Sequence, residues 1–129
     1  MDREVLVGEI RKLEAVLRKR HGPIALLMLV SPDPSVDDEW NVVVSAKGFN
    51  RISRAEGIRQ LTTILRRALG KELWPRIRRA TVLRTDDPFV DAMTSAFHTT
   101  GSVVELQSRN VIGFEISKGV LFTSKKVAA

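Results

Sequence analysis

Apolar residues recur along this chain at spacings that distinguish helices from strands. Between residues 2 and 20 the charged side chains fall largely away from one helical face. That face consists of Leu6, Ile10, Leu13 and Leu17. Residues 24–30 then have no polar position, which is typical of a strand covered on both sides of a sheet. We therefore predict an amphipathic helix that ends at His21-Gly22-Pro23, followed by a central strand.

The middle of the chain predicts a stiff loop, a second strand and a long helix. Two prolines within Ser31–Ser35 cannot donate to a sheet, so a loop extends through the acidic run that follows them to a strand at 40–46. Ser53 and Glu56 have the spacing of a capping box, and Gly70 is placed to end the helix that they start. The apolar stripe of this helix is Ile58, Leu61, Leu65 and Leu69.

The last third of the chain predicts one more helix and several strands. Residues 79–85 form the third strand, and Asp87-Pro88 starts a short helix as an N-cap followed by proline. Three segments of strand composition follow, at 103–107, 111–116 and 120–123. Arg109-Asn110 and Lys118-Gly119 are the turn signals between them. We predict an antiparallel meander of three strands.

These elements predict one α/β domain over residues 1–129, of the mixed α+β kind. Their order is αββαβαβββ, so we expect a mixed sheet of about six strands flanked by three helices. No internal repeat or low-complexity linker divides the chain. The helix between the strands at 40–46 and 79–85 makes a parallel crossover, whereas the short loop after residues 24–30 favours an antiparallel pair.

The amino-acid composition limits the kinds of chemistry that this protein can carry out. The 129 residues include no cysteine, which excludes disulfides, thiolate metal sites and cysteine nucleophiles and indicates a reducing compartment. The sequence shows no signal-peptide pattern, and its longest apolar run is far shorter than the about 20 residues of a membrane span. We therefore expect a soluble, cytoplasmic protein without membrane insertion. A formal net charge of +6 permits an anionic partner.

A basic nucleic-acid-binding protein is one functional alternative. Its phosphate contacts would come from Arg59, Arg66, Arg67, Arg76, Arg78 and Arg79, of which the first three are candidate binding residues on the second helix. A basic helix face is more often a solvated exterior than a phosphate site. With five phenylalanines, two tryptophans and no tyrosine, few aromatic side chains are available to stack on bases. Any such binding should be weak and salt-sensitive.

Most catalytic signatures are absent from the sequence. There is no glycine-rich nucleotide loop, no His-Glu-x-x-His and no Gly-x-Ser-x-Gly, and the two histidines, His21 and His98, follow helical stretches. The candidate ligands for a metal are Asp37, Asp38 and Glu39, in the loop before the second strand, and Asp86 after the third. Carboxylates of this kind suit Mg²⁺, but aspartates also bond turn backbones and cap helices.

One segment resembles a known family. A strand that ends at Ser31, a loop and then Glu39-Trp40-Asn41-Val42-Val43-Val44 are similar to the opening of the small nucleotidyltransferase superfamily, over roughly residues 2–70. In that family Gly-Ser follows the first strand, and an Asp-x-Asp pair on the next strand holds magnesium on a nucleoside triphosphate. Here the glycine is missing and Glu39-x-Asn41 keeps one carboxylate. The resemblance implies a shared scaffold with a defective metal site, because an amide substitutes poorly for a carboxylate.

From these observations we expect a non-catalytic binding or interaction module on a nucleotidyltransferase-like scaffold, without a cofactor. Ser31 and Asn41 are candidate binding residues, beside the three arginines of the second helix. The main alternative is a magnesium-dependent nucleotidyltransferase that uses the acidic residues named above as metal ligands. A nucleotide or another anionic ligand, a protein partner and a second copy of the chain all stay open as partners.

Overall fold

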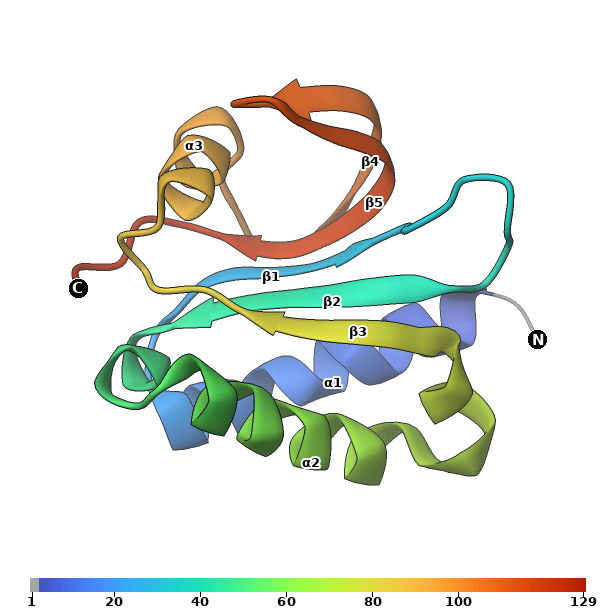
Figure 1. Cartoon of the computed structure of the whole chain (residues 1–129), viewed down its shortest axis with the longest axis horizontal. Coiled ribbons are helices and arrows are strands. Elements are labelled where there is room, and N and C mark those ends of the chain that lie inside the picture. Colours follow the sequence, from blue (N-terminus) through green and yellow to red (C-terminus); the bar gives the residue numbers. More distant parts are fainter. Residues whose placement is uncertain (1–2) are drawn as a thin grey trace.

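A computed structural model describes residues 3–129 as helices packed on one five-stranded sheet (Figure 1). The helices are α1 (Arg3–His21), α2 (Arg54–Leu73) and α3 (Pro88–Ala96), with 3₁₀ helices η1 (Lys47–Arg51) and η2 (Trp74–Arg76). The strands are β1 (Ile24–Val30), β2 (Trp40–Ala46), β3 (Ile77–Val82), β4 (Thr99–Val111) and β5 (Phe114–Ser124). No helix among the described residues is both long and apolar enough to cross a membrane.

The sheet is mixed, in the strand order β3-β2-β1-β5-β4. β1 is central, as its apolar sequence predicts, and runs antiparallel to β2, as the short loop after it predicts. It also runs antiparallel to β5. β2 and β3 run parallel, with Val44 opposite Val82, because α2 carries the chain back across the sheet between them. The β1–β2 and β2–β3 pairings confirm the sequence prediction, and the strand order leaves β3 and β4 as the two edge strands.

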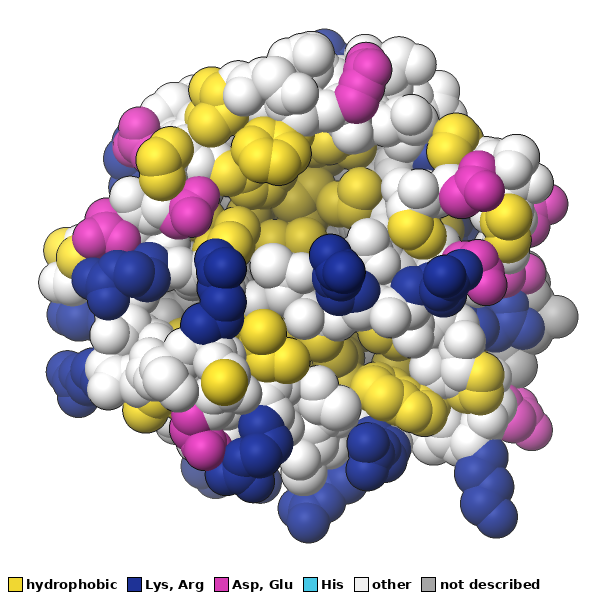
Figure 2. Space-filling model, viewed as in Figure 1, with side chains coloured by type: hydrophobic (Ala, Val, Ile, Leu, Met, Phe, Trp, Pro, Cys, Tyr) yellow, Lys and Arg dark blue, Asp and Glu magenta, His cyan; other side chains and the backbone are white. Residues whose placement is uncertain are grey.

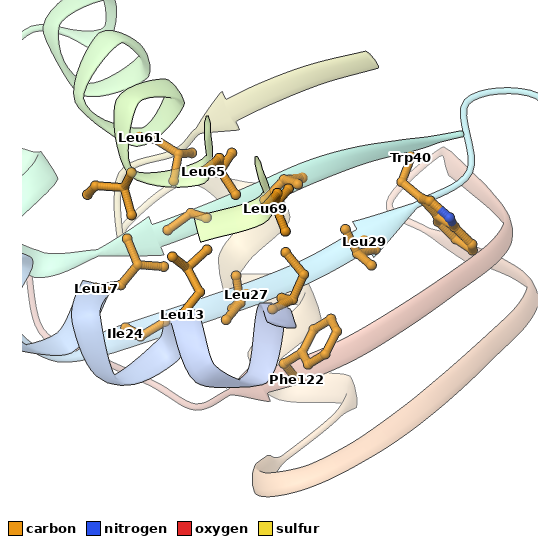
Figure 3. Close-up of a cluster of buried hydrophobic side chains, with 14 of the residues drawn as sticks. Leu13, Leu17, Ile24, Leu27, Leu29, Trp40, Leu61, Leu65, Leu69 and Phe122 are labelled. Carbon is orange, nitrogen blue, oxygen red and sulfur yellow. The ribbon is translucent and has the colours of Figure 1, made fainter. Parts of the chain in front are cut away.

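The two faces of the sheet have separate apolar cores. On one face α1 and α2 pack against β1 and β2 through residues such as Leu13, Leu27 and Leu65, all labelled in Figure 3. On the other face α3 and the curled β4–β5 hairpin pack against Leu26 and Met28 of β1. Alternate residues of β1 therefore enter opposite cores, which is why the strand has no polar position.

Local signals set the helix boundaries. The Ser53 hydroxyl accepts the Glu56 backbone N–H at 3.1 Å, but the Glu56 carboxylate accepts from Arg59 and Gln60, so only half of the expected capping box forms. Asp87 caps α3 by accepting the Phe89 N–H at 2.8 Å, as its position before proline predicts. Gly70 has the positive φ expected of a helix end, at 69°, and the chain makes one more helical turn beyond it to Leu73.

The C-terminal third differs from the sequence prediction: it forms two long strands, giving five strands in the sheet and not six. The turn lies at Ile112-Gly113, where φ is 43° and 90°, the signs of a two-residue hairpin turn. Neither expected turn forms, because Arg109 lies in register with Ile116 and Lys118 with Gln107. A Cβ at Gly119 would lie 3.1 Å from the Leu29 carbonyl oxygen, so this glycine permits close strand approach. β3 also begins and ends earlier than the predicted 79–85.

Candidate functional site

A hollow of about 470 Å³ lies on the α3 face of the sheet. Figure 2 shows it as an apolar depression above a row of basic side chains. The strands contribute Val30, Asn41, Val43, Arg79, Thr81, Phe114, Glu115 and Ile116, and the rest of the lining is Arg54, Leu83, Asp87, Pro88, Phe89 and Ile112. Elements distant in the sequence therefore enclose one concave site.

Strand alternation makes the floor of the hollow. In β3 and the residue after it, Arg79, Thr81 and Leu83 face the hollow, whereas Ala80 and Val82 pack into the core under α1 and α2. α3 has only nine residues and packs chiefly on β1, so the adjoining surface of β2 and β3 stays uncovered. Exposed apolar surface beside a packed core is the usual environment of a binding site.

The tip of the β4–β5 hairpin borders the hollow. Phe114 packs edge to face on Phe89 of α3, with ring centroids 5.3 Å apart, yet 59% of Phe114 is exposed. Ile112 is 57% exposed and has a φ of 43°, in the left-handed region that a β-branched residue rarely adopts. That conformation costs about 1–3 kcal/mol. The hairpin thus holds two large apolar side chains in solvent at the mouth of the hollow.

The rim of the hollow carries two guanidinium groups. Within residues 3–129, neither Arg54 nor Arg79 has an ion pair or a side-chain hydrogen bond, so both can accept an anionic partner. Of the two acids on the rim, Asp87 is occupied as the N-cap of α3. Glu115 lies on the hairpin, across the hollow from β3 in the sheet order.

An amide clamp fixes the segments that border the hollow. The Asn50 side chain donates to the Thr85 hydroxyl at 2.8 Å and accepts the Thr85 backbone N–H at 3.0 Å. Arg84 donates to the Asn50 carbonyl oxygen at 3.1 Å. Because Thr85 is buried, these bonds hold η1, and with it the start of α2 and Arg54, against the loop that enters α3.

The acidic residues predicted as metal ligands do not come together. Asp38 pairs with Arg76 at 3.0 Å and Glu39 with Arg78 at 2.9 Å, while Asp37 is exposed in the same loop. Asp86 lies beyond the carboxyl end of β3, whereas the loop residues precede the amino end of the parallel β2, so the two sets occupy opposite ends of the sheet. No group of three potential metal-ligating side chains exists within residues 3–129.

Two of the acidic residues are explained by local hydrogen bonds. Asp33 accepts the hydroxyl and the backbone N–H of Ser35, and these bonds hold the pKa of Asp33 below its ordinary value. Hydrogen bonds from Arg84 lower the pKa of Asp86. Asp33 therefore bonds the backbone of its own turn, and Asp86 forms an ion pair with Arg84 while Asp87 alone caps the helix.

The predicted binding residues are split between the two faces of the sheet. Asn41 lines the hollow. Ser31 follows Val30, the partner of Asn41 in the sheet, but does not line the hollow; it is buried, and its backbone N–H donates to the Lys118 carbonyl oxygen at 2.9 Å. The three arginines of α2 lie on the opposite face from the hollow. Arg59 pairs with Glu56, Arg66 lies over the Trp74 ring at 5.5 Å, and Arg67 is exposed.

Sequence reasoning missed Arg54, Ile112 and Phe114 as site residues. Arg54 is the first residue of α2. Ile112 lies in the hairpin turn and Phe114 directly follows it, whereas the sequence predicted turns at 109–110 and 118–119. The only local signal was Gly113, because glycine readily adopts the positive φ that the second position of this turn requires, whereas isoleucine before it disguises the turn. Comparison of the chain with protein-family models, with curated proteins and with solved structures finds no match.

Proposed function

We propose that this protein is a non-catalytic binding module whose hollow holds an apolar group next to a negatively charged one. The observation that carries the proposal is the pairing of an apolar floor with two unpartnered guanidiniums on one rim. The volume of about 470 Å³ lies in the range of small-ligand sites, which are mostly apolar with a few polar groups that fix orientation.

The chemistry of the lining favours binding over catalysis. The residues that border the hollow include no histidine, serine, cysteine or lysine, which supply most nucleophiles and general bases. Arginine holds carboxylate or phosphate through two parallel hydrogen bonds and does not deprotonate. Arg54 and Arg79 are therefore suited to recognise an anion, while Phe89 and Phe114 shield the apolar part from water.

A minimal amphipathic anion tests this proposal. Decanoate, acetate and decanol would be titrated into the ¹⁵N-labelled protein and followed by NMR. We expect saturable binding of decanoate with shifts at Thr81, Phe89 and Phe114, weaker binding of decanol, and none of acetate, because acetate lacks the apolar body. Absence of saturable decanoate binding would overturn the proposal.

Matched arginine variants locate the anion. Arg79→Ala should weaken decanoate binding roughly tenfold, the effect of about one charge-assisted hydrogen-bonded contact. Arg67→Ala removes an exposed arginine from the opposite face of the sheet and should leave the affinity unchanged. Equal losses in the two variants would show that net charge, and not the rim of the hollow, attracts the anion.

A further inference from the structure

The edge of the sheet beside the hollow is open. β3 is the last strand on its side and pairs only with β2. The Leu83 N–H donates to the Val44 carbonyl oxygen at 2.9 Å, so the backbone of Leu83 and of every second residue before it, Thr81 and Arg79, points toward β2. The N–H and C=O groups of Ala80, which lies between Arg79 and Thr81, therefore point outward. Within residues 3–129, no loop or turn backbone bonds to these two groups of Ala80.

The open edge and the hollow share one strand. Arg79, Thr81 and Leu83 line the hollow, while the outward backbone groups of Ala80 lie between the first two of them in the sequence. Ala80 packs its methyl group against the core and yet stays partly exposed, as expected for a residue on an uncovered edge. A strand added here would place alternate side chains over the hollow. β4, the other edge strand, contributes no residue to the hollow.

Charge decides which kind of segment fits this edge. Five arginines lie on or beside it: Arg76, Arg78 and Arg84, which are paired with acidic residues, and Arg54 and Arg79, which are not. Two copies of the chain paired edge to edge would bring the same positive groups together, and like charges across paired strands are destabilising. Arg54 and Arg79 in particular have no acidic partner of their own. An acidic segment from another protein avoids the repulsion between like charges and supplies carboxylates to Arg54 and Arg79.

Resting on the proposed function of the hollow, we propose that β3 accepts an extended, acidic segment of a partner protein as a sixth strand. Backbone hydrogen bonds form to the N–H and C=O groups of Ala80, an apolar side chain of the segment enters the hollow, and its carboxylates bind Arg54 and Arg79. The exposed Ile112 and Phe114 then cover the far side of the inserted side chain.

The test uses peptides selected from a random displayed twelve-residue library on the full chain. Selected sequences should combine acidic residues with apolar residues at alternate positions, and they should compete with decanoate. A scan of single N-methyl groups along one synthetic peptide then probes strand pairing. Each methyl that blocks a bond to β3 should weaken binding roughly tenfold, and methyls at the intervening positions should have little effect. Failure to select any peptide, or uniform tolerance of N-methylation, would overturn strand addition.

A protein variant separates the edge from the hollow. Ala80→Pro removes an outward N–H that plays no part in pairing with β2, and proline is tolerated on edge strands. We expect this variant to bind decanoate as the wild type does and to lose most peptide affinity. Wild-type peptide affinity in Ala80→Pro would refute strand addition while leaving the function of the hollow intact. If that variant does not fold, the N-methyl scan on the wild-type protein decides the question.

A second copy of the chain is the competing occupant. Sedimentation of the free protein should show a monomer. A dimer whose Ala80 amide becomes protected from hydrogen exchange would overturn the acidic partner in favour of self-pairing. Loss of decanoate binding in the wild type, by contrast, would count against the proposed function itself.

Discussion

The junction between α1 and η1 gives a sharp test of the packing. Gly48 lies so close to the end of α1 that a Cβ on it would sit 2.7 Å from both the Cα and the carbonyl oxygen of His21. Neither the end of α1 nor the η1 segment can move away freely, because each is held by other contacts. The His21 ring stacks on Phe49 with centroids 3.9 Å apart, and the Lys47 N–H donates to the Pro23 carbonyl oxygen at 3.0 Å.

We therefore expect Gly48→Ala to destabilise the fold. Contacts of 2.7 Å to backbone atoms force a shift of the whole segment, and overpacking of this kind costs about 1–3 kcal/mol. For a chain of this length each kcal/mol lowers Tm by roughly 4 °C, so the expected fall is roughly 4–12 °C. The displaced segment carries Asn50 and leads to Arg54, so decanoate affinity should fall as well.

Urea unfolding followed by tryptophan fluorescence measures the change, with the midpoint falling at an unchanged m-value. Gly8→Ala is the matched control, because Gly8 lies within α1 and an added Cβ there meets nothing within 4 Å. Replacing a helical glycine by alanine should stabilise the protein by about 0.5–1 kcal/mol. If Gly48→Ala unfolds within about 0.5 kcal/mol of the wild type, a margin typical of innocuous substitutions, the packing argument is wrong.

Four further predictions concern the core, the metal hypothesis, pH and the hairpin. Leu27→Asp should abolish cooperative unfolding, because an unpaired carboxylate at a fully buried position costs several kcal/mol; a parent-like melt would contradict the two-sided burial of β1. Asn41→Asp should gain no Tm from Mg²⁺ or Mn²⁺, since Glu39 is paired with Arg78; a metal-dependent rise would support the nucleotidyltransferase resemblance. Burial, and then the charge of Arg20, lower the pKa of His21 from 6.5, so its contribution to stability is present above pH 6.5 and is lost as the pH falls through the lower pKa of the folded state. The His21→Phe variant should therefore lose less free energy of unfolding than the wild type when the pH is lowered. An identical pH dependence of the two proteins would refute this. Ile112→Asn suits the positive φ of the hairpin turn and should melt no lower than the wild type but bind decanoate more weakly; unchanged affinity would remove the hairpin tip from the site.

Several features of the fold followed from local sequence because local physics decides them. The positions of Gly22, Ser53 and Asp87 marked helix ends, since unpaired backbone groups at a helix end need a capping partner or a positive φ. The apolar run of β1 indicated a strand covered on both faces. The parallel pairing of β2 with β3 followed from the helix between them.

The C-terminal strands could not be placed by the same reasoning. Asn110 and Gly119 are common in turns, but here both are paired within long strands. Glycine at 119 serves the close approach of β5 to the Leu29 carbonyl oxygen, a contact between residues 90 positions apart. Turn propensity is a local property, whereas strand register depends on the partner, so pairing overrode the local signal.

The sequence by itself determined the helices, the central strand and the lack of thiol chemistry, because spacing, caps and composition act within a few residues. Only the tertiary structure decided the site. Strand pairing brought Asn41 beside Arg79, the crossover brought Arg54 to the same rim, and hairpin register carried Phe114 onto Phe89. It also bound Glu39 and Asp86 to separate arginines at opposite ends of the sheet. Contacts between distant segments arise when apolar faces are buried together, and one segment's pattern does not encode which partner it meets.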